Sequence, residues 1–221
     1  MPAVVLLSGG LDSAVNLKQA LDETGVALAL TFDYGQKAAA REVAAAAAMC
    51  QALGVRHRVV ALPWLAEICH TALVNPEREV PRLKPEQLGE EQVTSGETAR
   101  AVWVPNRNGV FIAIAAAFAE SLGAEAVVTG FNAEEAATFP DNSAAFAAAA
   151  TAALQLSTAT AVRVVSYTQE LTKSEVMSLG RRIGAPLTMV WSCYYGGDAP
   201  CGDCESCARF LRAQQLADRQ S

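Results

Sequence analysis

The stretch Val4-Val-Leu-Leu-Ser-Gly-Gly-Leu-Asp-Ser13 decides the fold of this chain. Its apolar run, residues 4–7, predicts a buried strand of a parallel sheet, and the Ser-Gly-Gly that follows is a turn signal before a helical run over residues 13–22. The two glycines let the backbone approach a ligand closely, and main-chain N–H groups converge at the positive end of the helix. The stretch therefore predicts a phosphate-binding loop. Its binding residues are Ser8, Gly9, Gly10, Leu11, Asp12 and Ser13.

This loop differs from the two commoner phosphate-binding sequences. It has no Gly-x-x-x-x-Gly-Lys-Ser/Thr and therefore no Walker lysine, and it has no Gly-x-Gly-x-x-Gly dinucleotide fingerprint. So short a motif also occurs by chance, so an ordinary strand-to-helix turn is the alternative interpretation. The rest of the sequence has to decide between the two.

Composition predicts one globular, cytoplasmic α/β domain with a small appendage. The chain has 221 residues, of which 52% are hydrophobic and 18% charged, which is enough for a sizeable core. Its longest apolar stretch, residues 109–119, is too short to cross a bilayer, and no export signal opens the chain. The net charge of −6 argues against a broad nucleic-acid surface. We therefore expect neither a membrane nor a nucleic acid as a partner.

Apolar runs alternate with helical segments beyond the first helix. The further predicted strands are residues 26–32, 57–62, 126–129 and 162–166. The further predicted helices are residues 38–53, 109–122, 144–156 and 176–183. This alternation predicts a doubly wound parallel sheet, in which ligands bind beyond the carboxyl ends of the strands.

Three polar segments interrupt the alternation. Residues 75–104, rich in proline, glycine and charge, are interpreted as a long loop or lid. Residues 130–143 are interpreted as a polar loop at the carboxyl edge of the sheet. Thr172-Lys-Ser-Glu175 has the form of a capping box that begins a helix at the same edge.

A cysteine array near the carboxyl end predicts a metal site. Cys193, Cys201, Cys204 and Cys207 follow a C-x7-C-x2-C-x2-C pattern, and four thiolates match the tetrahedral coordination of structural zinc. Such a site orders a segment too poor in apolar residues to fold unaided, which divides the chain into a nucleotide-binding part, residues 1–190, and a metal-stapled tail with a helix, residues 191–221. An iron–sulfur cluster or unliganded thiols are the alternatives.

Charged residues near the predicted ligand edge are candidates for catalysis. Lys37, Lys173 and Arg107 are cations that can neutralise phosphate charge, which the loop itself does not do. Asp12 and Asp33 offer the hard oxygen ligands that Mg²⁺ prefers. Arg107 or the neighbouring Asn108 can orient a substrate.

Together these motifs resemble the 7-cyano-7-deazaguanine synthase (QueC) family of PP-loop ATP pyrophosphatases. The resemblance runs in order through Ser8-Gly-Gly-Leu-Asp-Ser13, Asp33-Tyr-Gly-Gln-Lys37, Val104-Pro-Asn-Arg-Asn108, Gly130-Phe-Asn132, Thr172-Lys173 and Trp191-Ser-Cys-Tyr194 with the cysteine tail. It implies that the nucleotide-binding set extends to Asp33, Gly35, Gln36, Asn108, Gly130 and Asn132.

The resemblance also implies an activity. Members of the family use ATP and Mg²⁺ to adenylate the carboxylate of 7-carboxy-7-deazaguanine with release of pyrophosphate. Ammonia then displaces AMP, and a second adenylation dehydrates the amide to a nitrile that feeds queuosine biosynthesis. Family members are typically zinc-bound homodimers, so we expect structural Zn²⁺, Mg²⁺, ATP as co-substrate and a small deazaguanine substrate.

The loop after Asn132 departs from the family pattern. Glu135 stands where the family has aspartate, and Phe139 replaces tyrosine. Asn142, Ser143 and Ala145 replace cysteine, arginine and glutamate, which removes two charges from a loop expected to contact the acceptor. Either these residues are dispensable, or the chain passes the activated acid to a protein or peptide amine and stops at the amide, a role that would suit antiviral defence.

Two further classes remain open from the sequence. PP-loop enzymes that thiolate tRNA share the loop, and some of them hold iron–sulfur clusters on cysteines. A nucleotide-binding module without catalysis is the third hypothesis and predicts ATP binding with no release of pyrophosphate.

Overall fold

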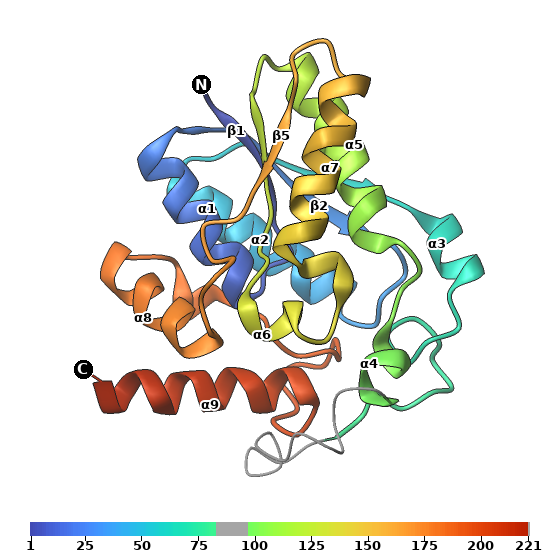
Figure 1. The fold of residues 1–221 in the computed structure, drawn as a ribbon. Helices are drawn as coiled ribbons and strands as arrows, with labels where there is room; N and C mark the ends of the chain where they lie inside the picture. Colours follow the sequence, from blue (N-terminus) through green and yellow to red (C-terminus); the bar gives the residue numbers. More distant parts are fainter. Residues whose placement is uncertain (83–96, 221) are drawn as a thin grey trace.

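A five-stranded, fully parallel sheet forms the centre of the computed structural model, which describes residues 1–82 and 97–220. The strand order is β3-β2-β1-β4-β5, so the first strand lies in the middle of the sheet (Figure 1). This arrangement confirms the predicted doubly wound sheet. The strands are β1 (Ala3–Leu6), β2 (Val26–Asp33), β3 (His57–Ala61), β4 (Ala126–Val128) and β5 (Arg163–Val165).

Alternating side chains divide the apolar core between the two faces of the sheet. In β1, Val4 faces one cluster while Ala3 and Val5 face the other, and all three are buried. Burial on both faces is the reason that this strand reads as a continuous apolar run.

Helices cover both faces of the sheet, as Figure 1 illustrates. The helices α1 (Leu11–Glu23) and α2 (Ala39–Leu53) pack on one face, and α5 (Arg107–Ser121) and α7 (Ala144–Ser157) pack on the other. The helix α8 (Lys173–Ile183) packs on α1, and α9 (Glu205–Gln220) packs on α8. No helix among the described residues is long and apolar enough to span a bilayer.

The remaining helices are short. They are α3 (Pro63–Ile68), α4 (Glu97–Val102), α6 (Ala133–Ala136) and the 3₁₀ turns η2 (Pro140–Asn142) and η3 (Leu187–Met189).

The structure corrects three predicted boundaries. The first helix begins at Leu11 instead of residue 13, because Gly10 is its N-cap and no side chain caps it. The predicted loop at residues 75–104 contains α4, while residues 83–96 of that prediction lie outside the described residues. The predicted loop at residues 130–143 contains α6 and η2. Segments this short show too little of a helical period for the sequence to reveal them.

The predicted capping box is confirmed. The Thr172 hydroxyl accepts a hydrogen bond from the backbone N–H of Glu175, and the Glu175 carboxylate accepts one from the backbone N–H of Thr172. This reciprocal pair begins α8 at Lys173, at the carboxyl end of the sheet. The cap thereby fixes the position from which the Lys173 side chain extends.

Candidate functional site

A cavity of about 270 Å³ lies at the carboxyl end of the sheet. Its walls come from the loop after β1, the ends of β2 and β4, the start of α5, the segment from α6 to η2, the start of α8 and the tail that follows η3. The cavity brings together these sequence-predicted residues: Ser8, Gly10, Leu11, Asp12, Ser13, Arg107, Asn108, Gly130, Lys173 and Cys193.

Hydroxyl groups brace the loop between β1 and α1. The Ser13 hydroxyl donates to the carbonyl of Gly10 at 3.0 Å and accepts from the backbone N–H of Ser8 at 3.2 Å. The Ser8 hydroxyl accepts from the backbone N–H of Gly10 at 3.3 Å. These bonds hold the loop against the first turn of α1, where free N–H groups favour an anion.

Gly9 lets the same loop pass close to α2. Its φ of +80° is in the left-handed region, and a Cβ at this position would lie 2.8 Å from the carbonyl oxygen of Glu42. Gly130 makes a second close approach, since a Cβ there would lie 3.0 Å from the backbone nitrogen of Ser13. Both glycines are therefore required by backbone contact.

Replacement of Gly9 by alanine is expected to destabilise the fold more than replacement of Gly25. Gly25 has the same φ of +80°, but a Cβ there meets nothing within 4 Å, so Gly25→Ala reports backbone strain alone, about 1–2 kcal/mol. In Gly9→Ala the new Cβ also clashes with the carbonyl oxygen of Glu42, which lowers the free energy of unfolding by roughly 1–3 kcal/mol more. Urea unfolding of both variants measures the difference. Equal losses would show that α2 moves away freely.

A lysine between two carboxylates forms the polar wall of the cavity. The Lys173 Nζ lies 2.7 Å from Asp12 Oδ2 and 2.5 Å from Glu135 Oε1. The Asn132 side-chain amide donates to Asp12 Oδ1 at 3.1 Å, and its oxygen accepts from the backbone N–H of Glu135 at 2.9 Å. Asn132 therefore positions the Asp12 carboxylate and the backbone of Glu135, although it does not itself line the cavity.

Burial and charge set the protonation of this cluster. Burial raises the pKa of Asp12, and the negative charge of Glu135 adds to the effect against the attraction of Lys173. Burial alone would raise the pKa of Glu135, but the charge and hydrogen bond of Lys173 outweigh it and the pKa falls. Burial would lower the pKa of Lys173, but both carboxylates raise it, so the lysine is charged. The cluster carries one net negative charge when both carboxylates are ionised.

A second cation, Arg107, faces the cavity from the start of α5. Its guanidinium donates to the Tyr34 hydroxyl at 3.2 Å, and among the described residues no carboxylate lies within ion-pair distance of it. Burial would lower the pKa of Arg107, but Tyr34 and the charges of Asp141 and Glu42 raise it. The guanidinium is charged, and its bond to the Tyr34 hydroxyl uses one of its five N–H donors.

The predicted residues at and just after the end of β2 lie outside the cavity lining. The ammonium group of Lys37 donates to the carbonyl of Arg78 and lies 5.6 Å from the centre of the Tyr195 ring. The Asp33 carboxylate accepts from the backbone N–H of Gly35 at 3.1 Å. These three contacts brace the loop, so the binding roles of Lys37, Asp33 and Gly35 stay predictions.

Gln36 braces the same loop. Its side-chain oxygen accepts from the backbone N–H of Tyr34 at 2.9 Å, and its amide donates to Glu42 Oε2 at 2.8 Å. Burial raises the pKa of Glu42. Glu42 lines the cavity and Gln36 does not, so the nucleotide-binding role of Gln36 also stays a prediction.

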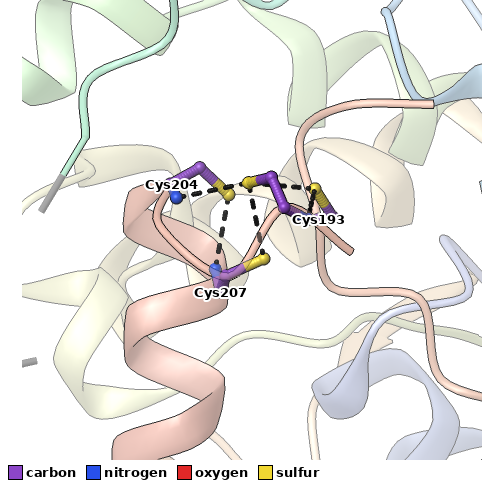
Figure 2. A group of neighbouring side chains, drawn as sticks. Cys193, Cys204 and Cys207 are labelled. Atoms are coloured by element: carbon purple, nitrogen blue, oxygen red, sulfur yellow. Dashed lines mark hydrogen bonds between the residues drawn. The ribbon is translucent and has the colours of Figure 1, made fainter. Parts of the chain in front are cut away.

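The four predicted cysteine ligands meet at one point. Their sulfur atoms all lie within 4.8 Å of one another, and Figure 2 shows Cys193, Cys204 and Cys207 pointing inward. The Cys193 and Cys201 sulfurs are 3.5 Å apart, and tetrahedral Zn–S bonds place ligand sulfurs about 3.8 Å apart. Backbone N–H groups of Tyr195 and Cys201 donate to the Cys193 sulfur. This donor set fits a closed, structural metal site.

The tail lines the cavity, which the sequence did not indicate. Trp191, Tyr194, Glu205 and Arg209 flank the cysteines and all line the cavity. Arg209 donates to Glu205 Oε1 at 2.7 Å and lies 3.8 Å from Glu134 of α6. Because the packing partner of a metal-stapled tail is a long-range property, no local pattern predicts these wall residues.

Comparisons with known proteins show the family to which the chain belongs. A family model described as queuosine biosynthesis protein QueC matches residues 2–218. A 7-cyano-7-deazaguanine synthase from Desulforamulus reducens is 56% identical and covers 96% of this chain and 93% of that protein. One from Pelotomaculum thermopropionicum is 56% identical over 100% of this chain and 99% of that protein, and one from Methanosarcina mazei is 46% identical over 96% and 93%.

A solved structure of NMN synthetase from Francisella tularensis has a TM-score of 0.49 and 16% identity, covering 99% of this chain and 84% of that one. The match of the family model over residues 2–218 and the relatives of similar length identify the family. The chain belongs to the family of queuosine biosynthesis proteins QueC.

Proposed function

We propose that this protein uses ATP to adenylate the carboxylate of 7-carboxy-7-deazaguanine, with release of pyrophosphate, and converts the activated acid with ammonia to 7-cyano-7-deazaguanine. The observation that carries the proposal is that, in a member of this family, one cavity combines the loop at Ser8–Ser13 with the Asp12–Lys173–Glu135 cluster. The relatives named 7-cyano-7-deazaguanine synthase support the product.

The reaction needs activation because a carboxylate would have to expel oxide when an amine attacks it. Adenylation replaces that leaving group with AMP. The free N–H groups in the first turn of α1, from Leu11 to Ser13, bind the phosphates of ATP, and the positive charge of Lys173 offsets negative charge that develops between the α- and β-phosphates. The carboxylate oxygens of Asp12 and Glu135 suit Mg²⁺, which would supply further charge neutralisation on the phosphates.

The altered loop after Asn132 supports a second candidate acceptor. Asn142, Ser143 and Ala145 carry no charge, and Glu135, which stands at the family's aspartate position, is paired with Lys173. A protein or peptide amine in place of ammonia would stop the reaction at the amide. The same assay separates the two acceptors by their products.

The test incubates the purified protein with ATP, Mg²⁺, 7-carboxy-7-deazaguanine and ammonium, and follows pyrophosphate and small-molecule products by mass spectrometry. Nitrile supports the proposed function. Pyrophosphate with adenylate or amide alone supports an alternative amine acceptor. Absence of pyrophosphate contradicts the proposal and favours the tRNA thiolation hypothesis. Visible absorption by an iron–sulfur cluster would then test that hypothesis.

The pH dependence of pyrophosphate release tests the role of Asp12. Because burial raises the pKa of Asp12 and the ionised form binds Mg²⁺, we expect the rate to fall on the acid side at a pH above the ordinary aspartate range. Glu135→Gln removes a neighbouring negative charge, so the acid limb moves to lower pH. Glu23→Gln on the exposed end of α1 is the matched control. An acid limb that does not move contradicts this assignment.

We also propose that the protein acts in the cytoplasm as a homodimer, with residues 1–190 as the nucleotide-binding part, residues 75–104 as a lid and residues 191–221 as a zinc-stapled tail. The cysteine cluster and the family relationship support the tail and the zinc. Light scattering on the purified protein and a metal analysis test the dimer and the zinc.

A further inference from the structure

Aromatic rings line the cavity near the starts of α5 and η2, and we call this part its aromatic end. The rings of Trp103 and Phe139 are within 10° of parallel with centroids 6.2 Å apart, and both line the cavity. Phe111, also in the lining, stacks on Phe32 at 4.1 Å and 10°. Flat, rigid faces of this kind stack with heteroaromatic rings irrespective of their substituents.

Two segments distant in sequence hold this end together. Trp103 precedes α5, Phe139 precedes η2, and the Asn108 side-chain amide donates to the carbonyl of Asp141 at 3.2 Å. The stacked rings and this hydrogen bond join the two segments at two points. Arg107 and Asp141, one from each segment, line the same cavity.

Arg107 and Asp141 offer complementary polar groups beside the rings. The Arg107 guanidinium has one hydrogen-bond partner among the described residues, Tyr34, and five N–H donors. The Asp141 carboxylate accepts from the Asn142 side chain at 3.3 Å and lies close enough to Arg107 to interact with its charge. A carboxylate has about four acceptor sites, so Asp141 retains capacity for donors on a ligand.

We propose that this end of the cavity binds the ring of the acceptor substrate. The flat ring stacks on Trp103 and Phe139, Arg107 donates to its exocyclic carbonyl oxygen, and Asp141 accepts from the adjacent ring N–H and amino groups. The identity of the ring as a 7-deazaguanine rests on the proposed function. The carboxylate of that substrate is on the five-membered ring, which leaves it free to face the phosphate-binding loop.

The experiment measures ring binding by calorimetry with the full-length protein and no ATP. The probes are 7-carboxy-7-deazaguanine and its analogue without the 2-amino group. We expect wild-type protein to prefer the aminated ring at least tenfold. Asp141→Asn is expected to weaken binding of the aminated ring roughly 10- to 100-fold and to remove the preference. Trp103→Leu is expected to weaken the binding of both probes roughly 5- to 100-fold.

Matched controls lie outside the cavity. Trp64→Leu removes an exposed tryptophan of α3, and Asp22→Asn changes an exposed carboxylate of α1 paired with Lys18. Both are expected to bind the two rings as the wild type does. ATP affinity should be unchanged in Asp141→Asn and Trp103→Leu, because the phosphate contacts proposed above come from the first turn of α1 and from Lys173.

The outcomes separate this subsite from the proposed function. Ring binding with the expected preference but without pyrophosphate release supports the subsite and contradicts the function. Pyrophosphate release with an unchanged KM for the acid in Asp141→Asn and Trp103→Leu contradicts the subsite and leaves the function standing. Equal affinity of wild-type protein for the two rings, or binding of neither, also contradicts the subsite.

Discussion

Cys204→Ser is expected to release the metal, to lower the melting temperature sharply and to abolish activity together. A structural zinc site contributes on the order of 10 kcal/mol to the folding of the segment it orders, and removal of one of four thiolates forfeits much of that. Activity is lost as well because Trp191, Tyr194, Glu205 and Arg209, which flank the cysteines, form one wall of the cavity.

Metal content by mass spectrometry, melting temperature and pyrophosphate release test this expectation. The release assay is run below the melting temperature of the variant, so that global unfolding does not account for the loss. Cys50→Ser is the matched control, since Cys50 is a buried residue of α2 and lies outside the cluster. Unchanged metal content or an unchanged melting temperature in Cys204→Ser would disprove the metal staple.

Lys173→Met is expected to reduce pyrophosphate release roughly 100- to 1,000-fold. It also leaves the carboxylates of Asp12 and Glu135 facing one another without a cation, which destabilises the fold by about 3–5 kcal/mol near neutral pH. Their folded-state pKa values then lie above the unfolded ones. The destabilisation is therefore present at neutral pH and is relieved as the pH falls through the raised values.

Urea unfolding at neutral and acid pH, with pyrophosphate release at saturating ATP, measures both effects. Lys18→Met removes a lysine paired with one carboxylate on the surface of α1 and should change stability by less than about 1 kcal/mol. Lys173→Arg keeps the positive charge but changes the shape of the side chain, so it distinguishes the effect of the charge from the effect of the geometry. A Lys173→Met variant with wild-type stability would contradict this expectation, because the two carboxylates would then be accommodated without the charge of Lys173.

Most of the sheet was predictable because the inner strands β1, β2 and β4 are largely buried and read as short apolar runs between helices. The elements that were not predicted are α3, α4, α6 and the 3₁₀ turns η2 and η3, which are too short to display a helical period. The start of α1 was predicted two residues late, since Leu11 and Asp12 continue the motif without a capping side chain. Gly10 fills the N-cap position through backbone conformation alone.

The candidate site was predictable in position and less so in its contacts. Asp12 and Lys173 follow different strands, and the rule that ligands bind at the carboxyl edge brought them together. Their direct pairing was not foreseen, because the lysine was expected to meet phosphate. Lys37 belongs to the same edge, yet its side chain turns toward Arg78 and Tyr195. Side-chain direction in a loop depends on distant neighbours that a local pattern does not contain.

The cavity wall formed by the tail is the last part of the cavity to be synthesised. A ribosome makes Ser8 and Gly10 long before Tyr194 and Arg209, so a nascent chain carries an anion-binding loop that is still open to water. Enclosure protects a reactive acyl intermediate from hydrolysis. Under the proposed function, a partial chain lacks this wall, and its position late in the sequence would limit wasteful turnover of ATP before synthesis is complete.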